Sequence, residues 1–563
     1  MPTDYLEDII GQAKASAKKQ ETKQEETKKI EDKEEEIAQE VKKEDLKELI
    51  TPSNQKEEID ESEISAKTQI EKELDTNKKI EVKSYGKVKI YKVPGKSLAY
   101  YFTPTVRPTG VDRRLINTLK EATTRLISIA PYKIRNPEER RVVYKQKIIE
   151  IIKNNPSLRI PETRTNFYAE AVVREMVGYG LIDDLIKDDQ LEEIMIVGPK
   201  KPVYVFHREY EMMITNIEFY SEQEIEDLVN KIAREIGRRV DVASPLLDAR
   251  LGDGSRVNAT IPPASISGGT ITIRKFRKDP YSIIDLIIMG TLSIEAAAFL
   301  WLCVEGFGTK PANILIAGGT GSGKTTLLNV LASFVPDRER VITIEDTAEL
   351  SLPIKHWIRL EARPPGLEGT GELRMDVLTK NSLRMRPDRI IVGEIRHEEA
   401  FTLFTALNTG HDGSLGTVHA NSAEETIVRV TSPPMNVPQV MLAGLDFIIV
   451  EHRYYDRKKG TIRRISEIAE VYGSMEGKTK TEIIFQRDPI KDHLERTLIE
   501  SKYLKVLQNF TGYRRERIEA ELISRQKFLE ELKEKNIRDL GEVSQRAKEF
   551  IESKKMVGET YEV

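Results

Sequence analysis

One stretch of the chain, residues 314–329, has the residue types and spacing needed to bind a phosphate chain. It reads ILIAGGTGSGKTTLLN: an apolar run, a glycine-rich loop, a Lys-Thr-Thr triplet and two leucines. Glycines let successive backbone N–H groups turn inward around phosphates, and a helix that starts at the loop points its positive end at the same place. The order of strand, G-x-x-x-x-G-K-[ST] and helix therefore predicts a P-loop.

The predicted P-loop divides phosphate binding between backbone and side chains. Lys324 is expected to reach the β- and γ-phosphates, and Thr325 to place its hydroxyl on Mg²⁺. The predicted nucleotide-binding residues are Gly318, Gly319, Thr320, Gly321, Ser322, Gly323, Lys324, Thr325 and Thr326. A glycine-rich turn that binds nothing is the alternative, but strand, spacing, Lys-Thr pair and helix agree. Because no N-K-x-D guanine signature follows, ATP is favoured over GTP.

Two acidic positions end apolar runs downstream of the P-loop. Glu345 and Asp346 end one run, and Glu394 ends the run 389–392. Ligands in α/β sheets bind at the carboxyl ends of strands, so these carboxylates should lie near the phosphates. Glu394 is expected on the metal side, with Thr325, and Glu345 to position or deprotonate the attacking water. A helix cap is an equal alternative for the adjacent pair taken alone.

Histidine is the next candidate, in the stretch 410–421, GHDGSLGTVHAN. His419 follows a short strand between small residues, which suggests contact with the γ-phosphate. His411 lies in a glycine-rich loop and is the weaker candidate, since a lone histidine is usually structural. No His, Cys and carboxylate spacing resembles a zinc site.

Two arginines flank a tight turn earlier in the chain, in LDARLGDGSRVN, residues 247–258. Arg250 and Arg256 alone suggest a hairpin with solvated charges, which is the commoner meaning of such a pattern. Their functional interpretation depends on the family resemblance described below.

The amino-acid composition limits the cellular compartment and the classes of partner that are expected for this protein. The 563 residues include 88 basic and 92 acidic side chains, for a net charge of −4, so there is no overall attraction to nucleic acid. The single cysteine, Cys303, lies in an apolar helical pattern, which indicates a core residue and a reducing compartment. No run qualifies as a membrane span or signal peptide, so a cytoplasmic protein that reaches the membrane through a partner is expected.

The periodicity predicts a charged tail and two folded parts. Residues 1–82 are too charged to form a core and are expected to be a flexible tail. Residues 83–277 alternate short, half-exposed strands with helices, which is typical of an α+β domain. Residues 278–510 alternate buried strands and helices around the P-loop, which predicts an α/β domain with a mainly parallel sheet and a late antiparallel hairpin. Residues 511–563 are expected to form outer helices, and Lys275–Pro280 is the candidate hinge.

Four motifs in chain order resemble those of the secretion and pilus ATPase superfamily, the type II/IV secretion ATPases. They match its Walker A, Asp box, atypical Walker B and His box at residues 318–326, 344–346, 393–394 and 416–421. The resemblance covers roughly residues 85–486. Within the superfamily, three stretches are similar to the archaeal branch, most closely the archaellum motor ATPases, at 356–361, 381–389 and 433–438.

The resemblance implies a fold, an activity and partners. It implies a RecA-like ATPase domain that hydrolyses ATP with Mg²⁺ and assembles as a homohexamer. It also implies a peripheral place at the cytoplasmic membrane, on a polytopic platform protein and beside other cytoplasmic components of a filament machine. Arg250 and Arg256 match the two arginines that the family carries from its N-terminal domain to the nucleotide. The chain lacks the four-cysteine zinc subdomain of many bacterial relatives, which fits the archaeal branch.

Three classes of function are compatible with a P-loop at this stage. The first is an ATPase motor for archaellum assembly or rotation, with adhesive pilus assembly and type II-like secretion as alternatives that use the same chemistry. The second is a nucleic-acid-translocating motor, which should carry basic loops with stacking aromatics, and no such cluster is evident. The third is a nucleotide sensor without hydrolysis, which the presence of Lys324, Glu345, Glu394 and His419 opposes.

Overall fold

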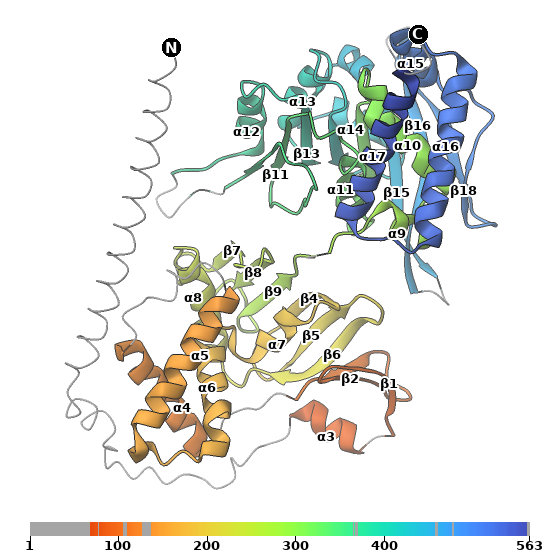
Figure 1. Ribbon diagram of the computed structural model, residues 1–563. Helices are drawn as coiled ribbons and strands as arrows, with labels where there is room; N and C mark the ends of the chain where they lie inside the picture. The colour runs from red at the N-terminus through yellow and green to blue at the C-terminus, as the bar shows by residue number, and fades with distance from the viewer. Residues whose placement is uncertain are drawn as a thin grey trace, which may run out of the picture. The chain divides into compact units, whose positions relative to one another are not determined.

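The protein consists of two compact units. The computed structural model describes residues 68–76, 78–104, 110–126, 137–277, 279–363, 365, 370–456, 460–475 and 478–559. The first unit is Met1–Phe276 and the second is Arg277–Val563 (Figure 1). The boundary between them falls inside the segment 275–280, and each unit has its own sheet and its own hydrophobic core.

A nine-stranded sheet forms the centre of the first unit, in the order β1-β2-β3-β6-β5-β4-β9-β8-β7. Neighbouring strands are antiparallel, except that β3 and β6 are parallel. The strands are β1 (Ile80–Tyr85), β2 (Val88–Lys92), β3 (Ala99–Phe102), β4 (Leu191–Ile196), β5 (Pro202–His207), β6 (Glu211–Glu218), β7 (Leu246–Arg250), β8 (Arg256–Thr260) and β9 (Thr270–Arg274). Buried and more exposed residues alternate along β5 and β8, as expected of strands with one face on the core.

Helices complete the first unit. They are α3 (Gln69–Thr76), α4 (Gly110–Leu126), α5 (Pro137–Asn154), α6 (Glu162–Met176), α7 (Asp183–Lys187) and α8 (Glu222–Glu235), with short 3₁₀ turns η3 (Pro156–Leu158) and η4 (Gly180–Ile182). Helices α4, α5 and α6 pack on one another around a separate apolar cluster. The α+β class predicted for this part of the chain is confirmed.

The segment 68–82 corrects the sequence prediction, which assigned it to the flexible tail. It contains α3 and the start of β1. Ile70 and Leu74 of α3 are buried in a cluster with Val93 and Tyr100. Few apolar residues suffice here because neighbouring strands supply the rest of the cluster, which composition alone does not reveal. The remainder of the predicted tail, residues 1–67, lies outside the described residues.

The second unit is built on another nine-stranded sheet, in the order β12-β11-β13-β14-β10-β15-β16-β17-β18. The six strands from β12 to β15 are parallel, and the last three pairings are antiparallel. The strands are β10 (Ile314–Gly318), β11 (Val341–Glu345), β12 (Trp357–Glu361), β13 (Arg389–Ile395), β14 (Leu415–Val418), β15 (Phe447–Asp456), β16 (Gly460–Met475), β17 (Lys478–Asp488) and β18 (His493–Arg496). The predicted parallel sheet and late antiparallel hairpin are both confirmed.

Two apolar clusters lie on the two faces of this sheet. Along β10, Ile314 and Ile316 belong to one cluster, while Leu315 and Ala317 belong to the other. The helices are α9 (Ile283–Ile288), α10 (Ile294–Glu305), α11 (Lys324–Ala332), α12 (Met375–Ser382), α13 (Glu399–Leu407), α14 (Ala423–Thr431), α15 (Lys502–Thr511), α16 (Arg515–Glu534) and α17 (Leu540–Glu559), with 3₁₀ turns η5 (Gly306–Gly308) and η6 (Gln439–Gly444). Covering both faces explains why the central strands are apolar throughout rather than alternating.

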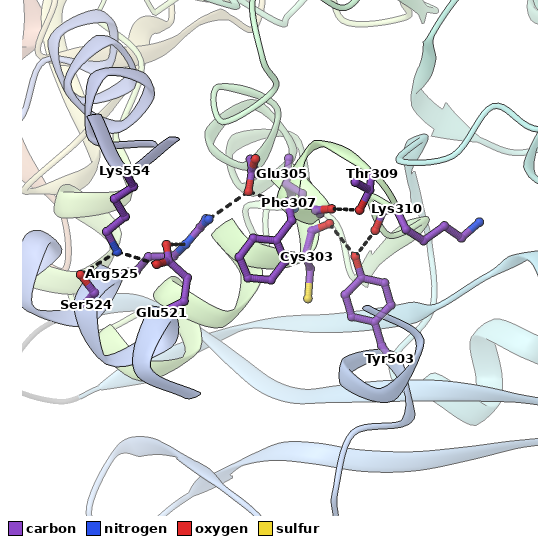
Figure 2. A network of polar contacts seen from close by, with 12 residues as sticks. Cys303, Glu305, Phe307, Thr309, Lys310, Tyr503, Glu521, Ser524, Arg525 and Lys554 are labelled. Atoms are coloured by element: carbon purple, nitrogen blue, oxygen red, sulfur yellow. Dashed lines mark hydrogen bonds and ion pairs between the residues drawn. The ribbon is translucent and has the colours of Figure 1, made fainter. Parts of the chain in front are cut away.

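The C-terminal helices pack into the same core as the P-loop strand. The guanidinium group of Arg525 on α16 is fully buried, lies 4.6 Å from the ring centroid of Trp301, and pairs with Glu305 at 2.9 Å and Glu521 at 3.0 Å (Figure 2). The hydroxyl of Tyr503 on α15 donates to two backbone carbonyl groups near the end of α10. These buried polar contacts tie residues beyond 500 to α10. No helix of the described chain is long and apolar enough to cross a membrane.

Candidate functional site

The P-loop leaves β10 through a turn that only glycine can make. Gly323 has a φ of +114° and directly precedes α11. A Cβ added to Gly318 would lie 2.3 Å from the carbonyl oxygen of Glu451 and 2.5 Å from Oγ of Ser322. Two of the glycines predicted from the motif are therefore required by backbone conformation or by close packing.

The side chains of the loop converge on its centre. Lys324 is only 8% exposed, and its ammonium group donates to the carbonyl oxygen of Gly319 at 2.9 Å. The Oγ of Ser322 is buried and has no hydrogen-bond partner among the described residues. Thr325 and Thr326 lie in the first turn of α11 and are partly exposed. A phosphate chain bound by this loop would provide the acceptor that Ser322 lacks.

Glu345 ends β11 and is 2% exposed. One carboxylate oxygen, Oε2, accepts hydrogen bonds from the backbone N–H groups of Glu349 at 2.7 Å and Leu350 at 2.9 Å. The other, Oε1, is buried without a partner. Burial raises the pKa of Glu345 to about 7, against the effect of those two hydrogen bonds. A carboxyl group that exchanges its proton near neutral pH suits a general base.

The two neighbouring strands bring Glu394 and His419 together. His419 follows β14, and its Nε2 lies 3.0 Å from Oε1 of Glu394 on β13, while Arg396 donates to the other oxygen of Glu394 at 2.5 Å. Burial lowers the pKa of His419, and the charge of Lys324 lowers it further. His419 is therefore neutral at neutral pH and can act through a single N–H group.

Gly393 has a packing role beside Glu345. A Cβ at this position would lie 3.0 Å from Cγ of Glu345, so a larger residue would displace that side chain. Thr417 of β14 donates its hydroxyl hydrogen to the carbonyl oxygen of Gly393 at 2.6 Å. Strands β11, β13 and β14 are thus locked together at the edge where the predicted residues meet.

The structure places two weaker candidates, Asp346 and His411, differently from Glu345 and His419. Asp346, next to Glu345, is exposed. His411 precedes β14, at the amino end of that strand, and its Nδ1 lies 3.5 Å from the hydroxyl of Thr409. The structure does not bring His411 to the carboxyl edge where His419 lies.

The two arginines of the first unit face each other across a hairpin. Arg250 ends β7 and Arg256 begins β8, and they are directly paired in register. Arg256 makes a two-pronged ion pair with Asp248, through Nε at 3.2 Å and Nη2 at 2.8 Å. Arg250 donates from Nε to the carbonyl oxygen of Gly254 at 3.3 Å. These contacts hold both guanidinium groups on the hairpin.

Three residues at the P-loop were missed by the sequence analysis. Glu451 of β15 pairs with Gly318, and its Oε1 would lie 2.5 Å from a Cβ on Gly323. Arg453 and Arg463 are opposite one another on β15 and β16 and both reach Gly321. The apolar run FIIVE before His452 was the available signal, but it did not distinguish a strand from a buried helix.

The residues at this edge fit a magnesium nucleotide. In P-loop sites the metal is held by few protein oxygens and by the phosphates themselves. The hydroxyl of Thr325 and the carboxylate of Glu394 are such oxygens, and the unpaired atoms of Ser322 and Glu345 lie on the same loop and edge. Among the described residues there is no cluster of three or more His, Cys, Asp or Glu side chains that could hold a metal ion by itself.

A P-loop at the carboxyl edge of a parallel sheet defines a nucleotide-binding protein. Residues 175–454 match the family described as "Type II/IV secretion system protein". Uncharacterized protein MJ0900 of Methanocaldococcus jannaschii is 36% identical over 390 residues, 68% of this chain and 69% of that one. VirB11, a type IV secretion system protein of Bartonella henselae, is 32% identical over 289 residues, 44% of this chain and 78% of that one. The chain belongs to the type II/IV secretion system protein family.

The chain is also similar to one further M. jannaschii protein and to a solved structure. Uncharacterized protein MJ0781 of M. jannaschii is 56% identical over 239 residues, 42% of this chain, but the match spans only 33% of its own length. Among solved structures, the crystal structure of the VirB11 ATPase from the Brucella suis type IV secretion system in complex with sulphate is 26% identical and covers 50% of this chain and 90% of that one, with a TM-score of 0.26. The family match and the identity with VirB11 of Bartonella henselae confirm the superfamily resemblance drawn from the motifs.

Proposed function

We propose that this protein is an Mg²⁺-dependent ATPase that cleaves the β–γ phosphoanhydride bond and drives a filament or secretion machine. The observation that carries the proposal is Glu345, a buried carboxyl group with a pKa near 7 and one oxygen without a partner, at the sheet edge that carries the P-loop. A group of this kind can take a proton from a water molecule that attacks the γ-phosphate. Mg²⁺ held by Thr325 and Glu394 would neutralise charge on the phosphates.

The remaining residues complete the reaction site. Lys324 supplies a cation at the β- and γ-phosphates, where negative charge builds up in the transition state. Neutral His419 donates one N–H group, so its hydrogen bond can report whether the γ-phosphate is present. Arg396 donates to Oε2 of Glu394 and leaves Oε1, which lies 3.0 Å from Nε2 of His419 without a hydrogen bond among the described residues, for the metal side.

Arg250 and Arg256 are proposed to reach the nucleotide in an assembled homohexamer. Their fork-shaped guanidinium groups would bind phosphate oxygens in place of Asp248 and the carbonyl oxygen of Gly254. The competing interpretation is that both arginines only stabilise their own hairpin, and their present contacts are compatible with either role. Hydrolysis would release the arginines and allow the units to move about a hinge in the segment 275–280.

The machine is proposed to be an archaellum, in which the ATPase powers filament assembly or rotation. The protein would bind from the cytoplasmic side to a polytopic membrane platform protein, alongside other cytoplasmic components. Support comes from the archaeal motif resemblance and from the M. jannaschii relatives. The identity with VirB11 favours a second candidate, a secretion ATPase, and adhesive pilus assembly uses the same chemistry. Translocation of nucleic acid is the least favoured function.

Phosphate release by the purified full chain tests the proposal. We expect hydrolysis with Mg-ATP that stops on chelation of the metal and does not increase with single-stranded or duplex DNA. Lys324→Ala should abolish it, because the lost cation cannot be replaced at the phosphates. A Lys324→Ala variant that hydrolyses ATP at the wild-type rate would remove the P-loop from the mechanism. Strong stimulation by DNA would instead favour the nucleic-acid motor.

A further inference from the structure

The hairpin formed by β15 and β16 holds the P-loop from the side opposite the carboxylates. In the sheet, β10 lies between β14 and β15. The strand pair that carries Glu394 and His419 therefore approaches the loop from the β14 side, while the hairpin approaches from the β15 side. Arg463 on β16 donates from Nε to the carbonyl oxygen of Gly321 at 3.0 Å. This bond connects residues 142 positions apart in the chain.

Arg463 uses little of its hydrogen-bonding capacity. A guanidinium group has five N–H donors in a rigid fork, and only the Nε–H of Arg463 has a partner among the hydrogen bonds and ion pairs of the described residues. Its terminal nitrogens, Nη1 and Nη2, carry the other four donors. The side chain is half-buried, so the fork is held at the loop rather than extended into solvent.

Gly321, the residue that Arg463 holds, lies between two arginines. It has a φ of +71°, and a Cβ there would lie 3.2 Å from Nη1 of Arg453. Arg453 is the cross-strand partner of Arg463. Two arginines beside a phosphate-binding loop that also carries Lys324 give this edge of the loop a positive charge that attracts an anion.

The buried acid Glu451, close to the loop, does not remove that positive charge. Glu451 lies behind Gly323, is 2% exposed, and its Oε2 has no hydrogen-bond partner. Burial raises its pKa to about 8, although Arg463 and Lys324 both act to lower it. At neutral pH the carboxyl group is therefore mostly protonated and leaves the charge of Arg463 available to a ligand.

We propose that Arg463 is a phosphate-binding residue of the nucleotide site, and that its terminal N–H groups bind the phosphate chain of ATP and ADP from the β15 side. The inference rests on the proposed function and extends it to a residue outside the four motifs. Arginine binds phosphate with two parallel hydrogen bonds, which fixes the orientation of the chain as well as attracting it. Lys324 supplies only a point charge at the same loop.

Titration of the full chain with a fluorescent ADP analogue tests the inference, with pyrophosphate as a competitor that lacks the base and ribose. Arg463→Gln should weaken both ligands about 10- to 100-fold, as expected for loss of hydrogen bonds to a charged group. Its thermal unfolding without nucleotide should not change. Arg463→Lys keeps the positive charge, so its affinity for both ligands should fall less than that of Arg463→Gln. Arg496→Gln, which removes a half-exposed arginine of β18 in the same sheet, should bind like the wild type.

The salt dependence of the affinity distinguishes phosphate binding by Arg463 from a purely structural role of this residue. If Arg463 contacts phosphate, the affinity of Arg463→Gln falls less steeply with salt than that of the wild type, while Arg463→Lys keeps the wild-type slope. Unchanged affinity in Arg463→Gln would overturn the inference. A weaker affinity with the wild-type salt slope would also overturn it, because the arginine would then only pin Gly321. If Lys324→Ala binds as tightly as the wild type, the proposed nucleotide site itself fails, which is a separate result.

Discussion

The two sheets of this protein have the same number of strands but use them differently. The sheet of the first unit is antiparallel apart from one pairing, and buried residues alternate with more exposed ones along strands such as β5, β8 and β9. The central strands of the second unit are parallel and buried on both faces. Parallel strands place all their carboxyl ends at one edge, so Glu345, Glu394 and His419 meet there although they are far apart in the chain. An antiparallel sheet divides such residues between two edges.

The buried charges of the two units differ in the same way. In the first unit, Lys231 donates to the carbonyl oxygens of Glu175, in the last turn of α6, and of Gly178, just after it, and Lys275 donates to that of Asp188, just after α7. These lysines satisfy backbone groups that a helix end leaves without partners. In the second unit, Glu345 and Glu451 each keep one buried oxygen without a partner. These two lysines therefore complete backbone hydrogen bonding in the first unit, whereas Glu345 and Glu451 lie beside the candidate site of the second.

The largest expected effect tests whether the antiparallel unit also contributes to chemistry. Arg250→Ala and Arg256→Ala should each lower turnover by about 10³-fold with ATP binding retained, because an arginine at the transferred phosphate stabilises the transition state. The free energy of unfolding should change by less than about 1 kcal/mol, since the ion pair of Arg256 is 38% exposed at the arginine. The measurements are steady-state phosphate release and chemical denaturation. Full turnover together with a marked loss of stability would limit both arginines to bracing the hairpin.

The second largest expected effect concerns Glu345, at the carboxyl ends of the parallel strands. Glu345→Gln should lower hydrolysis by about 10²-fold or more while Mg-ATP still binds, because the amide keeps the shape of the side chain but cannot accept a proton. The trapped nucleotide can be measured by quenching and separating ATP from ADP. Glu470→Gln is the matched control, as Glu470 is a buried carboxyl of β16 with a pKa near 7 that accepts hydrogen bonds from the backbone of Lys502 and Tyr503. Equal losses in both variants would contradict a specific role for Glu345.

A third variant checks that buried charge in the first unit is structural. Lys231→Met should cost about 2–3 kcal/mol in the free energy of unfolding, because two backbone carbonyl groups lose their donor in a buried place. Lys153→Met removes an exposed lysine at the end of α5 and should cost less than about 0.5 kcal/mol. Denaturant titration of the full chain gives both values. A cost for Lys231→Met no greater than that of the control would show that the carbonyl groups are satisfied without it.

The last expected effect, which is small over any single pH unit, is a pH dependence that belongs to the second unit. The pKa of Glu451 is raised from its ordinary value, near 4.5, to about 8 in the folded chain. The stabilisation of the protonated carboxyl is complete below about pH 4.5 and is lost as the pH rises toward 8, at about 1 kcal/mol per pH unit in the steepest part. Glu451→Gln should make the decline of stability between pH 5 and 8 less steep, as measured by denaturation at each pH, while Glu345 and Glu470 continue to contribute to it. A variant with the wild-type slope would show that Glu451 titrates normally.

Local patterns were sufficient for several elements of this protein. The P-loop was recognised because its glycines, lysine and threonine are consecutive and lie between an apolar strand and a helix. The positions of Glu345, Glu394 and His419 followed from a rule of parallel sheets, that ligands bind where strands end. In each case the determining residues lie within a short window of sequence.

Other features depended on partners distant in the chain. Helix α3 has too few apolar residues to be distinguished from the charged segment before it, and it is ordered by packing against Val93 and Tyr100. Strand β15 was ambiguous because a short apolar run can be helix or strand. Its place beside β10 is decided by pairing with residues more than 100 positions earlier. As a result, Glu451 had no recognisable pattern around it, and Arg463, although it starts the predicted hairpin, could not be placed at the P-loop.

The sequence by itself predicted the phosphate-binding loop and the acidic and histidine residues beside it, because phosphate binding by a loop is a property of consecutive backbone groups and neighbouring side chains. Only the tertiary structure decided the pKa values of those residues and which other side chains contact the loop. Burial between two apolar clusters raises the pKa of Glu345 and lowers that of His419, and strand order brings Arg463 to Gly321. Desolvation and strand pairing are sums over contacts from the whole domain, so no short stretch of sequence contains them.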